Sequence, residues 1–195
     1  MGVSKSIYDR VYRTCTYIAG DWSGDKDAVD KLMEWNEGNK WSLHFTDVHS
    51  LTQSYDGSLN CSIKSSLRKR MDISKKFVLI VGSKTKDLQS GACFRCVWYE
   101  APKSVFEFAS CTRGHLFVDN RSYIDFECAM AKNDFDKKEL DIVVLYNSVD
   151  VNSSLCPEPL RSIGTHAQMK KKVIDVYGFI HYDWDYESVR KAIEG

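Results

Sequence analysis

The chain has 195 residues, of which 43% are apolar and 28% are charged, and its 27 basic and 27 acidic side chains leave no formal net charge. This balance argues against a disordered chain, a collagen-like chain and a broadly basic nucleic-acid binder, so we expect no nucleic-acid partner. A chain of this length buries roughly 70% of its unfolded surface, which favours a single domain over residues 1–195.

The compartment is predicted from the N-terminus and the cysteines. The first residues, Met-Gly-Val-Ser-Lys-Ser, lack the apolar core of a signal peptide, and no apolar run approaches the ~20 residues that cross a bilayer. Seven cysteines without a secretory signal indicate free thiols in a reducing environment. We therefore expect a cytoplasmic protein with no membrane partner.

Strand and helix patterns alternate at the start of the chain. Thr14–Gly20 is rich in β-formers and ends at a glycine before a turn-rich stretch. Apolar residues three and four positions apart then predict a helix over 28–36. A second strand is predicted at Trp41–Phe45, and the long loop Thr46–Asn60 follows it.

The next unit repeats this order. Apolar residues four positions apart predict a helix over 60–72, capped by Ser58 or Asn60. Phe77–Val81 and Ile142–Tyr146 are almost continuous apolar runs. Such runs are typical of central parallel strands with both sheet faces covered.

About 60 residues separate these two apolar strands, which is more than one crossover helix needs. The helix in this interval is predicted at Arg121–Lys132, with Asp119 or Asn120 as its cap. Residues 86–119 are therefore interpreted as an insertion before the fourth helix and strand.

The end of the chain is predicted to contain a fifth strand within Val173–Tyr182 and a last helix over 186–193. Alternating strands and helices favour a parallel α/β sheet with right-handed crossovers. Ligands bind such sheets outside the carboxyl ends of the strands. The segments expected there are Gly20–Asp25, Thr46–Gly57, Gly82–Thr85 and the start of the 121–132 helix.

Glu127 is the most informative residue of the 121–132 helix. At about 100° per residue, it falls in the middle of an apolar arc that includes Tyr123 and Met130, whereas Asp125 falls on the polar side. A carboxylate on a buried helix face is costly unless something compensates it. Glu127 is therefore either a carboxylate lining a ligand cleft or a partly buried acid paired with Arg or Lys.

A local basic run accompanies the 60–72 helix. We interpret it as a solvated helix face, because the remainder of the chain neutralises its charge. Its members are Lys64, Arg68, Lys69, Arg70, Lys75 and Lys76.

The insertion contains Cys93, Cys96, Cys111 and His115 with the spacing C-x2-C-x14-C-x3-H. Two close pairs separated by a short arm are typical of a structural zinc knuckle. Aromatic residues between the pairs are enough to form a small satellite core: Trp98, Tyr99, Phe106 and Phe108. We favour the alternative of free thiols with His115 on the surface, so no metal ligand is assigned and structural zinc is not the preferred cofactor.

Three segments resemble, in order, a bacterial TIR-like family that includes the NAD-processing subunit of Thoeris anti-phage systems. The first strand and AA loop of that family resemble T-Y-I-A-G-D-W-S-G-D-K-D. Its second helix and third strand resemble N-C-S-I-K-S-S-L-R-K-R-M-D-I-S-K-K-F-V-L-I-V-G-S-K-T. Its active-site helix, with an aromatic-x-x-aromatic-Glu pattern, resembles R-S-Y-I-D-F-E-C-A-M-A. The resemblance covers roughly residues 14–85 and 120–195.

The resemblance implies a flavodoxin-like TIR fold, with three layers around a central five-stranded parallel sheet of order 2-1-3-4-5. It implies that NAD is the substrate and that the nicotinamide–ribose bond is cleaved to give ADP-ribose or a cyclic ADP-ribose-type signal. The catalytic glutamate of the family maps onto Glu127, with Glu100 as a fallback position. The BB loop of the family maps onto about 46–59.

The resemblance also implies which residues lie near NAD. The family's first-strand positions near the ligand map onto Ala19, Gly20 and Asp21. Ser83, after the third predicted strand, and Tyr123, one turn before the glutamate, complete the predicted NAD-binding set.

The expected function is an NAD-processing enzyme of bacterial anti-phage defence or signalling. Its expected partners are NAD, further copies of the chain and a downstream effector that senses the nucleotide product. The alternative is a non-enzymatic TIR-like signalling module that acts through self-association.

Overall fold

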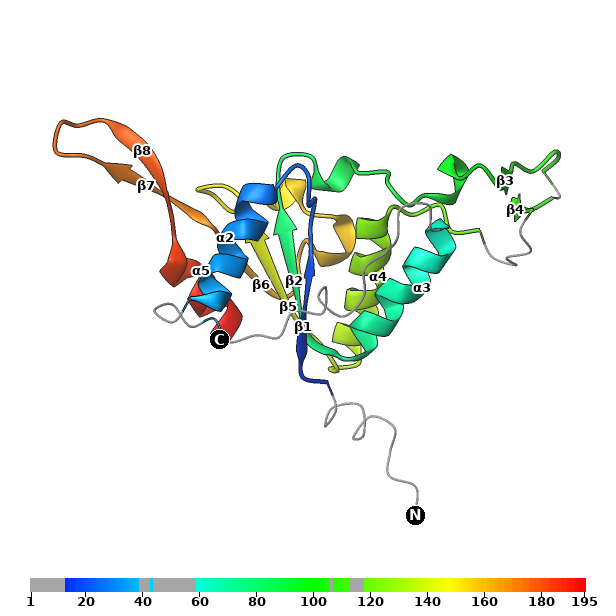
Figure 1. Cartoon of the computed structure of the whole chain (residues 1–195), viewed down its shortest axis with the longest axis horizontal. Helices are drawn as coiled ribbons and strands as arrows, with labels where there is room; N and C mark the ends of the chain where they lie inside the picture. The colour runs from blue at the N-terminus through cyan, green and yellow to red at the C-terminus, as the bar shows by residue number, and fades with distance from the viewer. Residues whose placement is uncertain (1–12, 39–42, 44–58, 106, 113–117) are drawn as a thin grey trace, which may run out of the picture.

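The computed structural model describes residues 13–38, 43, 59–105, 107–112 and 118–195. At its centre is a four-stranded sheet of order β1-β2-β5-β6, in which every neighbouring pair is parallel (Figure 1). These strands are β1 Cys15–Ala19, β2 Ser74–Val81, β5 Asp141–Tyr146 and β6 Thr165–Gln168. The predicted α/β class with a central parallel sheet is confirmed.

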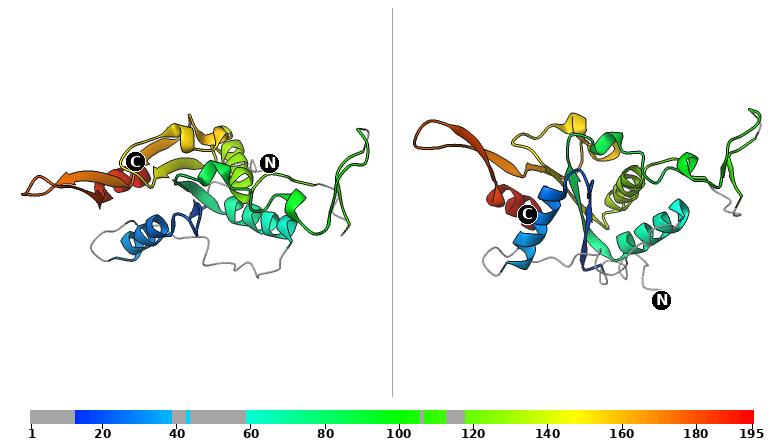
Figure 2. Two further views of the ribbon diagram at one scale, coloured as in Figure 1. Left: turned by 90° about the horizontal axis from the view of Figure 1, so that it is seen from above. Right: turned by 45° about the horizontal axis from the view of Figure 1, so that its top comes forward.

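Helices cover both faces of this sheet, which gives the predicted three layers (Figures 1 and 2). The helices are α2 Lys26–Glu37, α3 Asn60–Asp72, α4 Tyr123–Asp136 and α5 Tyr186–Glu194. In β2, Phe77 and Leu79 pack in the core shared with α3 and α4, whereas Val78 and Ile80 pack in the core shared with α2 and α5. Both sides of the strand are buried, and this explains its apolar run. None of the helices in the described part of the chain could span a membrane.

The five-strand count is only partly covered by the structure. The strand predicted at 41–45 lies outside the described residues except for Leu43, which is fully buried in the core shared with α2 and α5. The first, third and fourth predicted strands are β1, β2 and β5, and they lie side by side in the expected order. The complete order 2-1-3-4-5 therefore stays a prediction.

The placement of the fifth strand within Val173–Tyr182 was wrong. The parallel sheet ends at β6, and the later segment forms a separate antiparallel hairpin, β7 Lys170–Ile174 with β8 Ile180–Trp184. This hairpin extends away from the sheet (Figure 1). The short β6 sequence Thr-His-Ala-Gln contains one buried apolar residue, Ala167, so it lacks the apolar run that marks β2 and β5.

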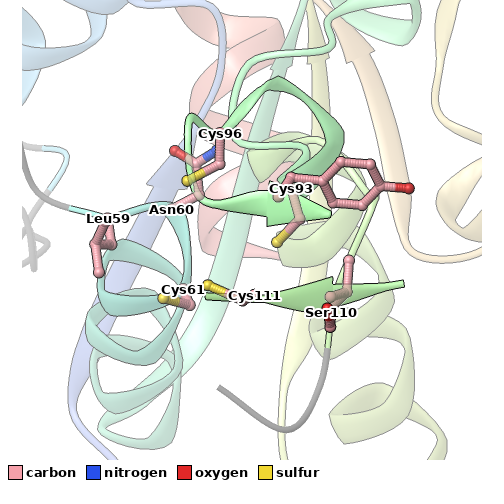
Figure 3. A pocket seen from close by; sticks show the side chains of 9 residues that line it. Leu59, Asn60, Cys61, Cys93, Cys96, Ser110 and Cys111 are labelled. Atoms are coloured by element: carbon pink, nitrogen blue, oxygen red, sulfur yellow. The ribbon is translucent and has the colours of Figure 1, made fainter. Parts of the chain in front are cut away.

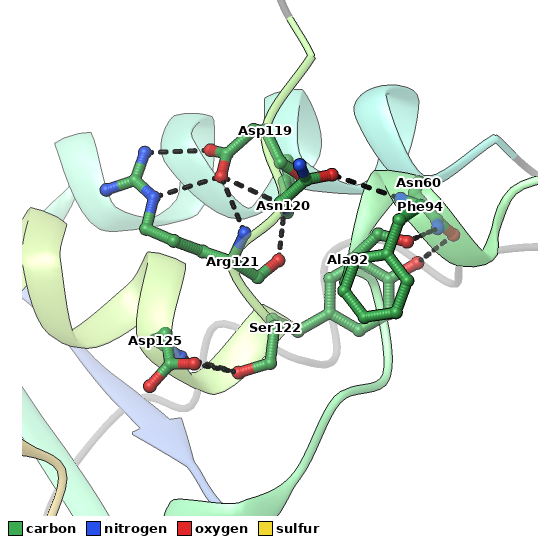
Figure 4. Close-up of polar contacts among 10 residues, drawn as sticks. Asn60, Ala92, Phe94, Asp119, Asn120, Arg121, Ser122 and Asp125 are labelled. Carbon is green, nitrogen blue, oxygen red and sulfur yellow. Dashed lines mark hydrogen bonds and ion pairs between the residues drawn. The ribbon is translucent and has the colours of Figure 1, made fainter. Parts of the chain in front are cut away.

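The predicted helix caps differ from those in the structure. The cap of α4 is Ser122, whose hydroxyl accepts a hydrogen bond of 3.0 Å from the Asp125 backbone N–H. Helix α3 starts at Asn60 without a side-chain cap. The alternative cap, Ser58, lies outside the described residues. Asp119, Asn120 and Asn60 instead make tertiary contacts that hold the two helix starts together (Figure 4).

Within 86–119, the described residues form 3-10 turns and a two-residue antiparallel ladder. These elements are η2 Thr85–Asp87, η3 Cys93–Arg95, β3 Tyr99–Glu100 and β4 Ser110–Cys111. The segment projects from the α3 and α4 side of the sheet (Figure 2). The described aromatic residues do not form the small satellite core considered with the zinc knuckle, because Phe108 is 95% exposed and Trp98 is 36% exposed. Phe106 and His115 lie outside the described residues.

The crossover from β5 to β6 contains the short turns η4 Ser153–Leu155 and η5 Glu158–Leu160. Leu160 and Cys156 from this connection are fully buried against the core that α4 shares with the sheet. The connection therefore covers the sheet beside α4 without adding a longer helix.

Candidate functional site

A cleft of about 530 Å³ lies between the loop after β1 and the facing sides of α3 and α4. Its volume falls in the range of small-molecule sites, roughly 300–1,000 Å³. Apolar side chains such as Ile63, Leu67 and Leu88 form part of its wall. The polar lining residues are Asp21, Ser23, Arg70, Ser90, Tyr123 and Glu127.

Glu127 is the buried acid of this cleft. It lies on α4, is only 5% exposed, and accepts a hydrogen bond on Oε1 from the hydroxyl of Tyr17 on β1. Burial raises the pKa of Glu127 to about 7, while the Tyr17 hydrogen bond and the positive charge of Arg70 act in the opposite direction. Glu127 therefore takes up and releases a proton near neutral pH.

Arg70 is the cationic group that sequence reasoning missed. It was assigned to a solvated face, yet it is 8% exposed and lines the cleft, and Lys64 is 4% exposed. Both residues are three positions from Leu67, so they share its helix face. That spacing was the signal available in the sequence.

Lys64 has a structural role at the start of α4. Its ammonium donates hydrogen bonds of 2.9 and 2.6 Å to the backbone carbonyls of Asp119 and Arg121, and it lies 3.5 Å from the Asp119 carboxylate. Arg121 also donates to Asp119, as Figure 4 shows. These contacts hold α3 against the segment that leads into α4.

Asp21 shapes the cleft beside the end of β1. Its Oδ1 accepts hydrogen bonds from the Ser23 backbone N–H at 3.1 Å and the Ser23 hydroxyl at 2.8 Å. A backbone hydrogen bond from Gly24 is the largest influence that lowers the Asp21 pKa. A Cβ at Gly24 would lie 2.4 Å from Asp21 Oδ2, so this turn depends on the close approach of backbone and carboxylate.

Tyr123 forms the cleft wall one turn before Glu127. Its hydroxyl donates a 2.9 Å hydrogen bond to Asn60 Oδ1, and burial is the main reason that its pKa rises to about 12. A Cβ at Gly91 would lie 2.4 Å from the Tyr123 ring, and Gly91 has a φ of +91°. The ring therefore packs directly against the 86–119 segment.

The structure brings together four of the six predicted site residues: Gly20, Asp21, Tyr123 and Glu127 all line the cleft. Ala19 is buried in the core instead, and Ser83 is exposed in the loop after β2, outside the cleft lining. The fallback acid Glu100 is exposed on β3 and accepts a 3.1 Å hydrogen bond from Ser110. The geometry favours Glu127 over Glu100 as the acid of this site.

A separate polar cluster lies at the carboxyl ends of the strands, and its contacts were not predicted from the sequence. Buried Asp25 accepts a 2.9 Å hydrogen bond from Asn147, and burial is the main cause of its raised pKa. Asn147 also donates to Asp27 at 3.0 Å, and Lys170 donates to Asp27 at 3.1 Å. This cluster ties the start of α2 to the residues that follow β5 and β6.

Together, the parallel sheet, its helical layers and the cleft define an α/β domain with a candidate ligand site beside the end of β1. Residues 15–90 match the family model of the Thoeris protein ThsB, TIR-like domain. This match confirms the predicted resemblance to a Thoeris-type TIR-like domain over those residues. The matched segment includes Tyr17, Asp21 and Arg70, whereas Glu127 lies beyond it.

Two further comparisons, with curated proteins and with solved structures, add no information on individual residues. The search of curated proteins gave no match. Among solved structures, the chain is similar to a metazoan TIR-STING receptor from C. gigas, determined in complex with 2′,3′-cGAMP, with a TM-score of 0.49 and 13% identity. The similarity covers 96% of this chain and 40% of the receptor chain.

Proposed function

We propose that this protein is an NAD-processing enzyme that cleaves the bond between nicotinamide and ribose. The observation that carries the proposal is Glu127, a buried carboxyl group lining a cleft large enough for a small-molecule ligand. The match of residues 15–90 to a Thoeris-type TIR-like family supports this proposal, because the family that the sequence resembles includes NAD-processing members.

The reaction breaks the C1′–N bond, and the electron pair of this bond leaves with neutral nicotinamide. The ribose becomes oxocarbenium-like in the transition state. The Glu127 carboxylate stabilises this developing positive charge and accepts hydrogen bonds from ribose hydroxyls. Its low exposure strengthens the interaction, because little water screens the two charges. Nicotinamide is a cationic leaving group before cleavage, so no strong general acid is required.

Other cleft residues would orient NAD. Arg70 supplies a positive charge complementary to the pyrophosphate, and the Tyr123 ring forms an apolar wall for a flat base. Gly20 and Asp21 would position the ligand beside β1. Because Ala19 and Ser83 do not line the cleft, neither is assigned a contact with NAD.

The product depends on the nucleophile that attacks C1′. Water would give ADP-ribose, and a group of the adenine or a ribose hydroxyl would give a cyclic isomer. The proposal places this reaction in bacterial anti-phage defence or signalling in the cytoplasm, with an effector that senses the nucleotide product.

The alternative is a non-enzymatic module that self-associates. The observation favouring it is the β7–β8 hairpin, on which six apolar side chains are 54–93% exposed. Contiguous exposed apolar surface is typical of interaction sites. The residues are Ile174, Val176, Tyr177, Phe179, Ile180 and Tyr182.

Nicotinamide release from NAD tests the enzymatic proposal. Wild-type protein is assayed over a range of concentrations that includes self-associated states. Glu127→Gln should lower turnover by on the order of 10²–10³, the effect of deleting one electrostatic stabiliser. The matched control is Glu100→Gln, which should retain wild-type turnover because Glu100 is outside the cleft.

Either of two results would contradict the proposal. Absence of nicotinamide release at every wild-type concentration would favour the non-enzymatic module. Loss of release in Glu100→Gln with full release in Glu127→Gln would move the active site into the 86–119 segment.

A further inference from the structure

A second cavity lies where the 86–119 segment meets the start of α3. Four cysteines from three separate segments line it: Cys61 on α3, Cys93 and Cys96 around η3, and Cys111 on β4 (Figure 3). The remaining cysteines, Cys15, Cys128 and Cys156, are buried elsewhere in the core. The fold therefore gathers the four half-buried thiols of the chain at one place.

The cavity has the size of a single ion. Its volume is about 20 Å³, and the space for one water molecule is roughly 10–15 Å³. Its lining is otherwise largely apolar, from Leu59, Tyr99 and Val118. A small cavity rich in thiols and otherwise mainly apolar suits a closed, four-coordinate structural metal site.

The backbone already provides a Cys-x-x-Cys turn. The Cys96 backbone N–H donates a 2.8 Å hydrogen bond to the Cys93 carbonyl, closing the turn over η3. The Cys93 N–H donates a 3.1 Å hydrogen bond to the Asp119 carbonyl, and Asn60 Nδ2 donates a 3.1 Å hydrogen bond to the Ala92 carbonyl (Figure 4). These bonds fix η3 next to the helix turn that carries Cys61.

The outer part of the 86–119 segment, in the residues that the structure describes, buries little apolar surface. Val97, Val105 and Phe108 are exposed, and the β3–β4 ladder has two residue pairs. Small units without a hydrophobic core generally depend on disulfides or a metal ion. All four cysteines are free thiols, so their sulfurs are available to a metal ion.

We propose that Cys61, Cys93, Cys96 and Cys111 bind one Zn²⁺ ion and thereby fasten the 86–119 segment to α3. This set replaces His115 of the C-x2-C-x14-C-x3-H pattern with Cys61, which lies 32 residues before Cys93. Binding releases the thiol protons and forms four Zn–S bonds of about 2.3 Å. The proposal is independent of NAD cleavage.

The ligands have to converge when the ion binds. Within the described residues, no group of three or more His, Cys, Asp or Glu side chains is arranged to hold a metal as it stands. Rotation about the Cα–Cβ bond moves each cysteine sulfur while the backbone stays in place. The four side chains already line one cavity, so they converge on its centre when the ion binds.

Zinc content distinguishes Cys61 from His115 as the fourth ligand. Full-length protein, purified without chelator and supplied with Zn²⁺ under reducing conditions, should retain about one equivalent after gel filtration. Cys61→Ser should lose at least ten-fold in zinc affinity, whereas His115→Ala should bind zinc as the wild type does. Cys15→Ala is the control for loss of a cysteine outside the cavity.

Wild-type protein that retains no zinc would overturn the proposal. So would zinc loss in His115→Ala with full binding in Cys61→Ser, because the ligand set would then be the one with the histidine. If Cys61→Ser fails to fold, Co²⁺ is bound to wild-type protein instead. Sulfur-to-cobalt charge-transfer absorbance of four thiolates supports the proposal, and that of three thiolates contradicts it.

Discussion

Helix α4 carries two buried acids, Glu127 and Asp134, and their surroundings differ. Asp134 accepts a 3.0 Å hydrogen bond from the guanidinium of Arg13, which also lies 3.4 Å from Glu139. Glu127, seven residues earlier, receives a hydrogen bond from the neutral hydroxyl of Tyr17 and lines the cleft. One acid is neutralised within the fold, and the other is available to a ligand.

This difference shows how one helix can carry both an acid that stabilises the fold and an acid that is proposed to act in catalysis. Seven residues are two helical turns, so both carboxyl groups lie on the same side of α4. A close guanidinium offsets the cost of burying Asp134. Glu127 has a neutral hydroxyl as its hydrogen-bond partner, and burial outweighs both this bond and the positive charge of Arg70, so its pKa rises to about 7. The partner of each acid therefore distinguishes the structural from the proposed catalytic role.

The largest effect on folding is expected at Asp134. Asp134→Asn removes one charge of a buried pair and should lower the free energy of unfolding by about 3–5 kcal/mol. The value should fall near the lower end, because Glu139 keeps a negative charge beside Arg13. Urea denaturation at pH 7.5 measures the change. Glu127→Gln is the matched control on the same helix, and equal destabilisation of the two variants would remove the distinction between the acids.

The second largest effect is expected from Glu127, as a change in the free energy of unfolding with pH. Its ordinary pKa is 4.5 and its folded-state pKa is about 7, so the folded state binds the proton more tightly. The resulting stabilisation is complete below pH 4.5 and is lost as the pH rises through 7. On the order of 3 kcal/mol should therefore disappear across this window.

Comparing wild type with Glu127→Gln isolates that contribution. Relative to the variant, wild-type protein should lose stability between pH 5 and pH 8 in urea denaturation. A constant difference between the two proteins over this range would mean that Glu127 titrates normally in the folded state.

A smaller effect is expected at the cleft wall. Tyr123→Phe removes the 2.9 Å hydrogen bond to Asn60 and should lower the free energy of unfolding by about 1 kcal/mol. Tyr177→Phe on the exposed hairpin provides the control and should change stability by less than about 0.5 kcal/mol. Equal effects of the two substitutions would show that the hydrogen bond between Tyr123 and Asn60 contributes nothing measurable to the free energy of unfolding.

The sequence correctly predicted features that depend on the residue spacing within a single strand or helix. The apolar runs of β2 and β5 indicate burial on both faces, and the helix position of Glu127 places it among apolar neighbours. These predictions depend on spacing within one strand or helix. They succeeded because local periodicity decides which side of the element is buried.

The missed features depend on contacts between distant segments. Arg70 reads as a solvent-facing cation until α4 places Glu127 nearby. The sequence Asp119-Asn120-Arg121-Ser122 contains several possible caps, and tertiary bonds to Asp119 and Asn120 leave Ser122 for the helix. Cys61 joins the other thiols only when 86–119 packs against α3.

The central claim is that Glu127 acts as a carboxylate with a raised pKa, and the pH profile of kcat/KM for nicotinamide release tests it most directly. This profile reports the ionisation of the free enzyme. Wild-type activity should rise with pH around an apparent pKa near 7. In Tyr17→Phe that pKa should increase by about one unit, because a hydrogen bond that favours the charged carboxylate is lost. A wild-type transition near 4.5, or the same profile in both proteins, would contradict the claim.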